Sequence, residues 1–512
     1  MVTAASMSMS AGEWAWRPVS GVLAAIVCVL VLVVLLIRRR RYVAFYENIP
    51  GPKGYPVIGN VLQLLGPQTE LFKMYMKYFK DFGDVYVLWV GTSPFVFIGS
   101  AEAAQPLLSS SACIEKSAEY KLLEKWLGTG LVTSKGEKWH QRRKLLTPSF
   151  HFKLLESFIQ PASSCSDVLV QLLRKEVDRE EFDVTEYIKL VAVDIIAETA
   201  MGYHLNAQLN ARCDFIKAIN TLSAISQKRF MTPWLKVDSI YNLTSYAKQE
   251  DEACNVVHQL RDTIVKGRRE TRESSKQESN PKEQGKIRLS LLDFMMENNM
   301  SDEDIGEEVD TFMFAGHDTV ATVVSWSLFV LAQHKNVQKG ILEEFAAVSA
   351  SAENPFSVSS ISKLEYLDRC VKEIMRLYTP VPLIARTANV PLKINDYYLP
   401  EGTRILTILH AIHMDPKHHA DPTSFNPDRF SSENTADKHP FSYVPFSAGS
   451  RNCIGQKYAM LVVKIILIKI LEAYELSTTM QSTDLKMYAE LVLINEGGIK
   501  ISLEERKHSA NA

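Results

Sequence analysis

The chain has 512 residues, and its 57 basic and 59 acidic side chains give a formal net charge of −2. Hydrophobic residues make up 46% and charged residues 23%, which is a globular composition and excludes a disordered or collagen-like chain. The balanced charge argues against a nucleic-acid-binding protein, which would carry a large basic excess. Seven cysteines occur without a Cys-x-x-Cys pair, so a zinc ribbon or thioredoxin-type site has no support.

The first forty residues predict a membrane anchor. Val19 to Ile37 is a run of 19 uncharged, mostly aliphatic residues, which as a helix spans roughly 28 Å, close to the hydrocarbon thickness of a bilayer. Arginines at 38–41 follow at once, so the positive-inside rule places the rest of the chain in the cytosol. We interpret 19–37 as a transmembrane signal-anchor after a short lumenal N-terminus, 1–18. A cleaved signal peptide is the alternative, but no small-residue cleavage site follows the run.

The anchor is followed by a basic linker, 38–49, and by a body, 50–512, that we expect to be one cytosolic catalytic domain. Its pattern predicts a mainly α-helical fold with small β-sheets. The charged stretch from Lys266 to Arg288 contains a proline and a glycine, and we interpret it as a surface loop between helices.

Two β-hairpins are predicted near the ends of this body. At the first, Asp84 to Gly91 and Phe95 to Gly99 form strands around a turn at Thr92 and Ser93. At the second, 491–494 and 499–503 form strands on either side of two consecutive glycines.

A single thiol carries the most specific motif of the chain. Phe446 begins the segment Phe-Ser-Ala-Gly-Ser-Arg-Asn-Cys-Ile-Gly, in which Cys453 precedes an apolar helical pattern. A thiolate in front of a helix is stabilised by the amides of the helix N-terminus. A buried structural cysteine is the alternative for a single thiol. The spacing Phe-x-x-Gly-x-Arg-x-Cys-x-Gly resembles the haem-ligand loop of cytochromes P450, the haem-thiolate monooxygenases. The resemblance implies the cytochrome P450 fold, with Cys453 as the proximal iron ligand and Phe446 beside the cofactor.

A long helix is predicted from Ser301, which has Asp304 three residues later as a capping partner, to about His334. Inside it, Asp318 and Thr319 place a carboxylate beside a hydroxyl on an apolar helix. The alternative is a bond from the threonine hydroxyl to the carbonyl one turn earlier. The resemblance implies that both hold: the helix opens locally over the haem, with Thr319 and Asp318 handling protons for bound oxygen.

Two further motifs match the same family. Glu373 and Arg376 lie on one helix face, and Arg429 belongs to a Pro-x-Arg-Phe element. The resemblance implies that these three form a structural Glu–Arg–Arg cluster.

The haem propionates need cationic or N–H donors. Trp139 and Arg143 match Trp-x-x-x-Arg, and Arg386 and Arg451 fit the other propionate-facing positions of the family. Their neighbours Arg142 and Lys144 are expected on a solvated face, or on a docking surface for an electron donor.

Segments 146–152, 308–314 and 452–457 resemble family-4 cytochromes P450, the fatty-acid omega-hydroxylases and their insect relatives. Many members carry Glu where this chain has Ala315, and that Glu can form an ester to a haem methyl group. Without it, we expect haem b to be bound non-covalently and strict terminal-carbon selectivity to be weakened. The substrate-pocket candidates, for each of which core packing is the alternative, are Phe314, Ala315, Val320, Val381, Leu383 and Ile384.

The predicted function is that of a monooxygenase of the endoplasmic reticulum membrane, facing the cytosol. It uses O2 and NADPH electrons from NADPH-cytochrome P450 reductase, with cytochrome b5 as a second candidate donor, to hydroxylate a lipophilic substrate. A fatty acid oxidised at or near its omega carbon is favoured, and hormone, terpenoid or xenobiotic oxidation is the alternative. A peroxide isomerase, a non-catalytic haem or lipid binder and a membrane-structural protein are less favoured.

Overall fold

The computed structural model describes residues 42–150, 152–210, 213–278 and 290–506, together with 26, 27, 29, 30, 33, 34 and 37–40. The predicted signal-anchor, 19–37, therefore lies largely outside the described residues, and its assignment stays a prediction. In the described part of the chain the fold is mainly helical with small sheets, as the sequence predicts. The helices that build most of the molecule are α2 (Gln68–Phe82), α5 (Gly136–Leu146), α6 (Phe152–Leu173), α7 (Thr185–Thr199), α8 (Cys213–Met231), α10 (Ser245–Glu278), α12 (Asp302–Gln333), α13 (Lys335–Ala350), α15 (Glu365–Leu377) and α18 (Gln456–Ala473).

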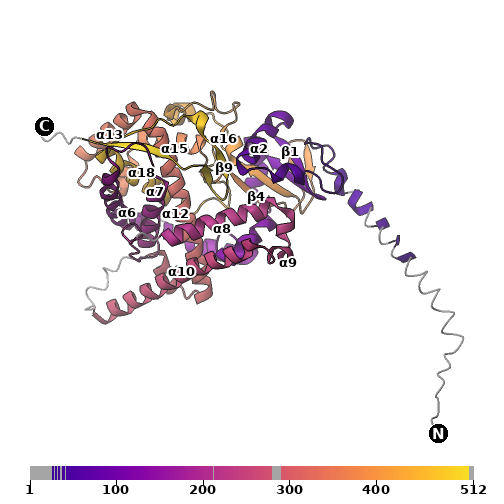
Figure 1. Cartoon of the computed structure of the whole chain (residues 1–512), viewed down its shortest axis with the longest axis horizontal. Coiled ribbons are helices and arrows are strands. Elements are labelled where there is room, and N and C mark those ends of the chain that lie inside the picture. Colours follow the sequence, from indigo (N-terminus) through magenta and orange to yellow (C-terminus); the bar gives the residue numbers. More distant parts are fainter. Residues whose placement is uncertain are drawn as a thin grey trace, which may run out of the picture.

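Helix α12 runs through the centre of the fold. After its acidic first turns it is mostly apolar on all sides, as expected of a helix surrounded by others, and it packs against α7, α10, α15 and α18. Its N-terminus is capped as predicted, because the Ser301 hydroxyl accepts from the Asp304 amide at 3.1 Å. Figure 1 shows α6, α7, α12 and α18 gathered on one side of the molecule, and β1 with α2 on the other. The expected local opening is absent, since residues 302–333 form one continuous α-helix.

Among the described residues, α12 is the one helix whose length and hydropathy would suit a membrane span. Most of its apolar window, 83%, is buried inside the protein, which is the position of a core helix.

The largest sheet has the strand order β1-β2-β7-β4. Its strands are β1 (Val85–Val90), β2 (Ser93–Ile98), β7 (Arg404–Ile408) and β4 (Leu383–Thr387). The predicted first hairpin is present, with Val90 opposite Ser93, so the turn lies at Gly91 and Thr92, one residue earlier than expected. Gly91 has a φ of 63°, a conformation that glycine adopts without strain.

The predicted second hairpin is wrong. Strand β10 (Leu493–Asn495) pairs with β9 (Met487–Ala489), whereas β11 (Lys500–Glu505) pairs with β8 (Tyr474–Ser477) and β3 (Phe182–Asp183). The two segments thus belong to different sheets. Two further strands, β5 (Leu392–Ile394) and β6 (Tyr397–Leu399), form a small hairpin of their own.

The predicted surface loop from 266 to 288 is also wrong over its first half, because α10 continues to Glu278. Two arginines in this half pair with acids on neighbouring helices: Arg268 with Asp293 on α11 (Leu291–Glu297), and Arg269 with Asp302 on α12. Residues 279–289 lie outside the described part.

Candidate functional site

A mostly apolar cavity of about 350 Å³ lies between α12, the loop before α18 and the edge of the largest sheet. All six predicted pocket residues line it: Phe314, Ala315, Val320, Val381, Leu383 and Ile384. The predicted site residues Thr319, Phe446, Arg451 and Cys453 also line it, whereas Trp139, Arg143, Asp318 and Arg386 are not among its lining residues.

Cys453 lies three residues before α18, and its accessible surface opens into the cavity. Its amide donates to the Phe446 carbonyl at 2.9 Å, which closes the loop on itself. Burial raises the pKa of the thiol, and the Gly455 amide and the Arg143 guanidinium oppose that rise. A cation or a metal at this thiol would therefore favour the thiolate.

Glycine is required in this loop at Gly449. Its φ is 70°, and a Cβ there would lie 1.9 Å from the Leu108 carbonyl oxygen at the end of α3 (Ala101–Leu108). The loop therefore packs backbone against backbone, and this contact sets its position.

Three cations gather at one end of the cavity. Arg451 donates to the carbonyls of Ile114 and Ser134 and stacks on the Trp139 ring, with 4.2 Å to its centroid. Arg386 on β4 is buried, and Lys116 lies beside it through a bridge between their backbones. Within the described part of the chain, none of these three cations has a carboxylate oxygen within ion-pair distance.

The electrostatics of this cationic cluster, Lys116, Arg386 and Arg451, indicate a missing anion. Burial and the neighbouring guanidinium of Arg386 lower the pKa of Arg451 to about 10. Burial also lowers the pKa of Arg386, and burial together with Arg386 and Arg451 lowers that of Lys116. Buried cations are ordinarily paired, so this end of the cavity suits a ligand with negative charges.

Arg143 and Trp139 both belong to α5, but they do different things. Arg143 donates to the Asn452 backbone carbonyl at 2.8 Å and to its side-chain oxygen at 2.7 Å. It therefore holds the loop directly beside Cys453. Trp139 is buried beneath Arg451.

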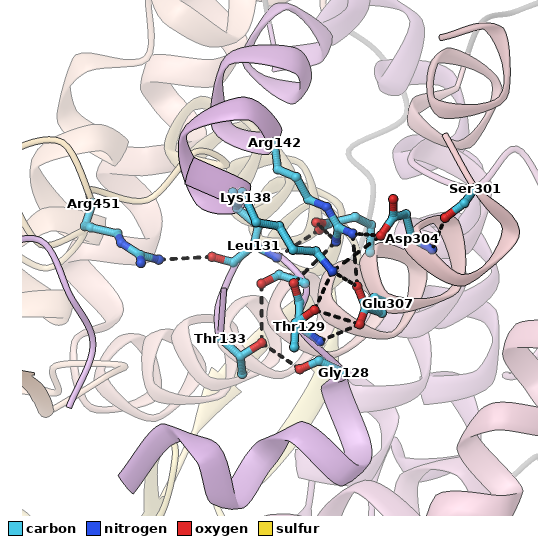
Figure 2. Close-up of polar contacts among 12 residues, drawn as sticks. Gly128, Thr129, Leu131, Thr133, Lys138, Arg142, Ser301, Asp304, Glu307 and Arg451 are labelled. Atoms are coloured by element: carbon cyan, nitrogen blue, oxygen red, sulfur yellow. Dashed lines mark hydrogen bonds and ion pairs between the residues drawn. The ribbon is translucent and has the colours of Figure 1, made fainter. Parts of the chain in front are cut away.

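The expected solvated face is wrong for Arg142, although Lys144 is exposed as predicted. Arg142 is only 5% exposed, and Figure 2 shows it aimed at the acidic first turns of α12. It forms ion pairs with Asp304, with Glu307 at 3.0 Å and with Glu308 at 2.8 Å. These contacts join α5 to α12.

The same acidic residues hold the loop at 128–134, two of whose carbonyls accept from Arg451. Glu308 accepts from the Leu131 amide at 3.1 Å, and the Leu131 carbonyl in turn accepts from Arg451 at 3.4 Å (Figure 2). Glu307 accepts from the Thr129 amide at 2.8 Å. The cavity wall is thus connected to the helix pair behind it.

On α12, the Thr319 hydroxyl faces the cavity and donates to the Ala315 carbonyl at 2.7 Å, the bond predicted as the alternative for this residue. Asp318 is buried, 3.3 Å from the ammonium of Lys189 on α7. Glu490, in the turn between β9 and β10, lines the cavity, and burial together with the charge of Asp318 raises its pKa to about 7.

The structure also brings Glu373, Arg376 and Arg429 together. Arg376 makes two hydrogen bonds of 2.8 Å to the Glu373 carboxylate, and Arg429 donates to the same carboxylate at 3.1 Å. All three are buried, away from the cavity lining, and the guanidinium groups also donate to backbone carbonyls of the segment 413–424.

Comparison with known proteins decides the family. The cytochrome P450 family profile matches residues 49–503. Cytochrome P450 4c3 of Drosophila melanogaster is 36% identical over 494 residues, covering 93% of this chain and 92% of its own. Cytochrome P450 4V2 of Homo sapiens is 36% identical over 466 residues, covering 89% of each chain. Cytochrome P450 4c21 of Blattella germanica is 35% identical over 490 residues, covering 94% and 98%.

The chain belongs to the cytochrome P450 family. It is a monooxygenase of family 4, as the sequence motifs predict, with the P450 fold. Membership implies a haem cofactor, O2 and a redox partner.

The cavity of this P450 fits a haem group in two respects. A haem needs an axial ligand on its iron, and Cys453 presents a thiol whose free surface opens into the cavity. Its two propionates need cationic partners, and no carboxylate of the described residues lies within ion-pair distance of the cationic cluster.

Sequence reasoning missed Lys116, Lys189 and Glu490. Each is an ordinary charged residue in a segment without a motif, and each reaches the site only through the tertiary fold. A charge inside an otherwise apolar strand end or helix is the one local signal that they offer.

Proposed function

We propose that this P450 hydroxylates a fatty acid at or near its omega carbon. The observation that carries the proposal is a deep, mostly apolar cavity with the Cys453 thiol and the Thr319 hydroxyl on its walls. Such walls suit an alkyl chain, because removing apolar surface from water favours its binding. Bound haem supplies the oxygen-activating chemistry, with Cys453 as its thiolate ligand.

Side chains of the protein bind the haem and hold its site in place. Arg386, Arg451 and Lys116 bind the propionates, and Trp139 supports Arg451 from behind. Arg143 holds the Cys453 loop through Asn452. Phe446 packs beside the cofactor.

Asp318 and Thr319 move protons toward the cavity, with Lys189 orienting the Asp318 carboxylate at 3.3 Å. Phe314, Ala315, Val320, Val381, Leu383 and Ile384 hold the alkyl chain, and the cluster of Glu373, Arg376 and Arg429 stabilises the fold.

The haem is bound non-covalently. Position 315, which lines the cavity, carries a methyl group and no carboxylate, so no ester to a haem methyl can form there. Acidic organic extraction should release the haem intact, and haem that stays with the protein would contradict this. The small side chain also leaves room for oxidation beside the terminal carbon.

We further place the enzyme in the endoplasmic reticulum membrane, anchored by 19–37, with its catalytic domain in the cytosol. NADPH-cytochrome P450 reductase is its electron donor, and cytochrome b5 is a second candidate. These assignments follow from the apolar run at 19–37 and the arginines at 38–41. They also follow from the microsomal location that is typical of eukaryotic family-4 enzymes.

The test is turnover of a graded-length panel of fatty acids by the full-length enzyme with reductase and NADPH, with products located by mass spectrometry. Terminal and adjacent hydroxylation supports the proposal. Absence of fatty-acid products from a preparation with a thiolate-type CO spectrum would contradict it and favour hormone, terpenoid or xenobiotic oxidation.

A further inference from the structure

A second charged group faces the cavity, apart from the cationic cluster. Lys236 ends η5 (Pro233–Lys236), and its ammonium lies 3.6 Å from the carboxylate of Glu119 in η2 (Ala118–Leu123). Arg404, at the start of β7, reaches the same carboxylate at 3.0 Å. Glu119 and Lys236 line the cavity, and Arg404 stacks behind them on the cavity residue Phe95, with 4.0 Å to its ring centroid.

The charges of this group do not balance. Glu119 supplies one negative charge, whereas Lys236 and Arg404 supply two positive charges. Arg404 is the closer partner, and Glu119 also accepts from the Ser117 hydroxyl. The contact of Lys236 with the Glu119 carboxylate is therefore the weakest of the three. The Lys236 side chain is only 23% exposed, which makes its uncompensated charge costly.

The cationic cluster differs in this respect. Glu115 acts electrostatically on two of its three cations, Arg386 and Arg451, and the two propionates of a haem would supply two further negative charges. The positive charge at Lys236 is therefore surplus even in the haem-loaded protein.

The cavity wall beside Thr319 has the opposite character. Glu490 and Asp318 place two carboxyl groups there against one ammonium, that of Lys189. An anionic headgroup is disfavoured at this wall and favoured at Lys236. The cavity is thus positively charged at Lys236 and acidic beside the proton-handling pair, Asp318 and Thr319.

We propose that Lys236 binds the carboxylate of the fatty-acid substrate and thereby directs the other end of the alkyl chain toward Thr319 and Cys453. This inference rests on the proposed function and specifies the recognition that it leaves open. On binding, the Lys236 ammonium exchanges its 3.6 Å contact with Glu119 for the substrate carboxylate, while Glu119 keeps its closer partner, Arg404. Lys236 is a specificity residue, since it distinguishes an acid from a neutral lipid of the same length.

A structural role of Lys236 is the competing explanation, because its contact with Glu119 joins two loops. The two roles predict different results for matched ligands. If Lys236 only joins the two loops, its substitution should change the Kd for dodecanoic acid and for methyl dodecanoate alike. If Lys236 binds a carboxylate, the substitution should change only the Kd for the acid.

The experiment is a spectral binding titration of the full-length haem-loaded enzyme with both ligands. Lys236→Gln should raise the Kd for dodecanoic acid about 10- to 100-fold, the range of a lost charge-assisted hydrogen bond, and change the Kd for methyl dodecanoate less than about twofold. Lys236→Arg should restore most of the affinity for the acid. Glu119→Gln, which removes the competing carboxylate, should tighten binding of the acid.

Lys228→Gln is the matched control, because Lys228 is exposed at the end of α8 and does not line the cavity. It should leave both constants unchanged. An unchanged ratio of the two constants in Lys236→Gln would overturn this inference and leave the proposed function standing. A wild-type enzyme that binds neither ligand would overturn both.

Discussion

Arg142 and Glu308, which are 166 positions apart in the sequence, form an ion pair with 2.8 Å between guanidinium nitrogen and carboxylate oxygen. The Glu308 side chain has no exposed surface, and that of Arg142 is 6% exposed. The same carboxylate accepts from the Leu131 amide, and the Leu131 carbonyl accepts from Arg451 of the cationic cluster. One buried pair therefore joins α5, α12 and the loop over the cationic cluster (Figure 2).

Removing the cation of this pair should be strongly destabilising, because Glu308 would be left buried without its counter-charge. We expect Arg142→Met to lower the free energy of unfolding by about 3–5 kcal/mol. The measurement is urea unfolding of the haem-loaded enzyme. Lys144→Met is the control, since Lys144 is exposed on the same helix, and it should change stability by less than about 0.5 kcal/mol. Equal losses in the two variants would contradict the argument.

Lys116 offers a test of the cationic cluster that does not depend on turnover. If its ammonium binds a propionate, Lys116→Met should weaken haem binding about 10- to 100-fold, and the haem-to-protein absorbance ratio should fall after gel filtration. Lys121→Met is the matched control, because Lys121, five residues later in η2, is exposed and does not line the cavity. Full haem retention in Lys116→Met would exclude Lys116 from the cofactor site.

Local sequence patterns were sufficient for α18 and for α12 with its capped start, because periodicity and capping involve residues close in the chain. The partner of strand β11 could not be predicted in this way. Residues 499–503 look like half of a local hairpin, but β11 pairs instead with β8 and with the distant β3. Which partner a strand takes depends on packing that a local pattern does not contain. Likewise, the charges of 266–278 resemble a solvated loop until the acids of α11 and α12 are placed beside them.

The candidate site divides in the same way. Cys453, Thr319, Arg451 and the six pocket residues could be named because they belong to motifs or follow one closely. Lys236 and Glu490 could not, since each is an ordinary charged residue whose neighbours come from other elements. The sequence pattern also hides that Arg142 is buried while Lys144 is exposed, because acids on a separate helix make that difference.

Thr319 and Asp318 should control the coupling of electron use to product formation. We expect Thr319→Ala and Asp318→Asn each to lower product formed per NADPH by about tenfold or more, while NADPH oxidation continues and hydrogen peroxide accumulates. Thr322→Ala is a close control, because the Thr322 hydroxyl makes the same kind of bond, to the Asp318 carbonyl at 2.8 Å, but lies outside the cavity lining. Equal uncoupling in Thr322→Ala would indicate a helix effect and not proton delivery.

Glu490 should make stability depend on pH. Burial and the Asp318 charge raise its pKa in the folded state from 4.5 to about 7, while Lys189 opposes them. The stability that protonated Glu490 contributes is therefore present below about pH 4.5 and is lost as the pH rises through about 7. Glu490→Gln should remove this loss, so its stability relative to wild type should improve between about pH 5 and about pH 8. The gain has an upper limit of about 3 kcal/mol, which solvent screening reduces.

The measurement for Glu490→Gln is denaturant unfolding at these two pH values. Glu496→Gln is the control, because Glu496 follows β10 with its side chain 61% exposed, and its substitution should leave the pH dependence unchanged. A Glu490→Gln variant that loses stability with rising pH as steeply as the wild type would mean that Glu490 keeps an ordinary pKa. The cavity wall beside Thr319 would then carry a full additional negative charge at neutral pH, which would increase the difference in charge between this wall and Lys236.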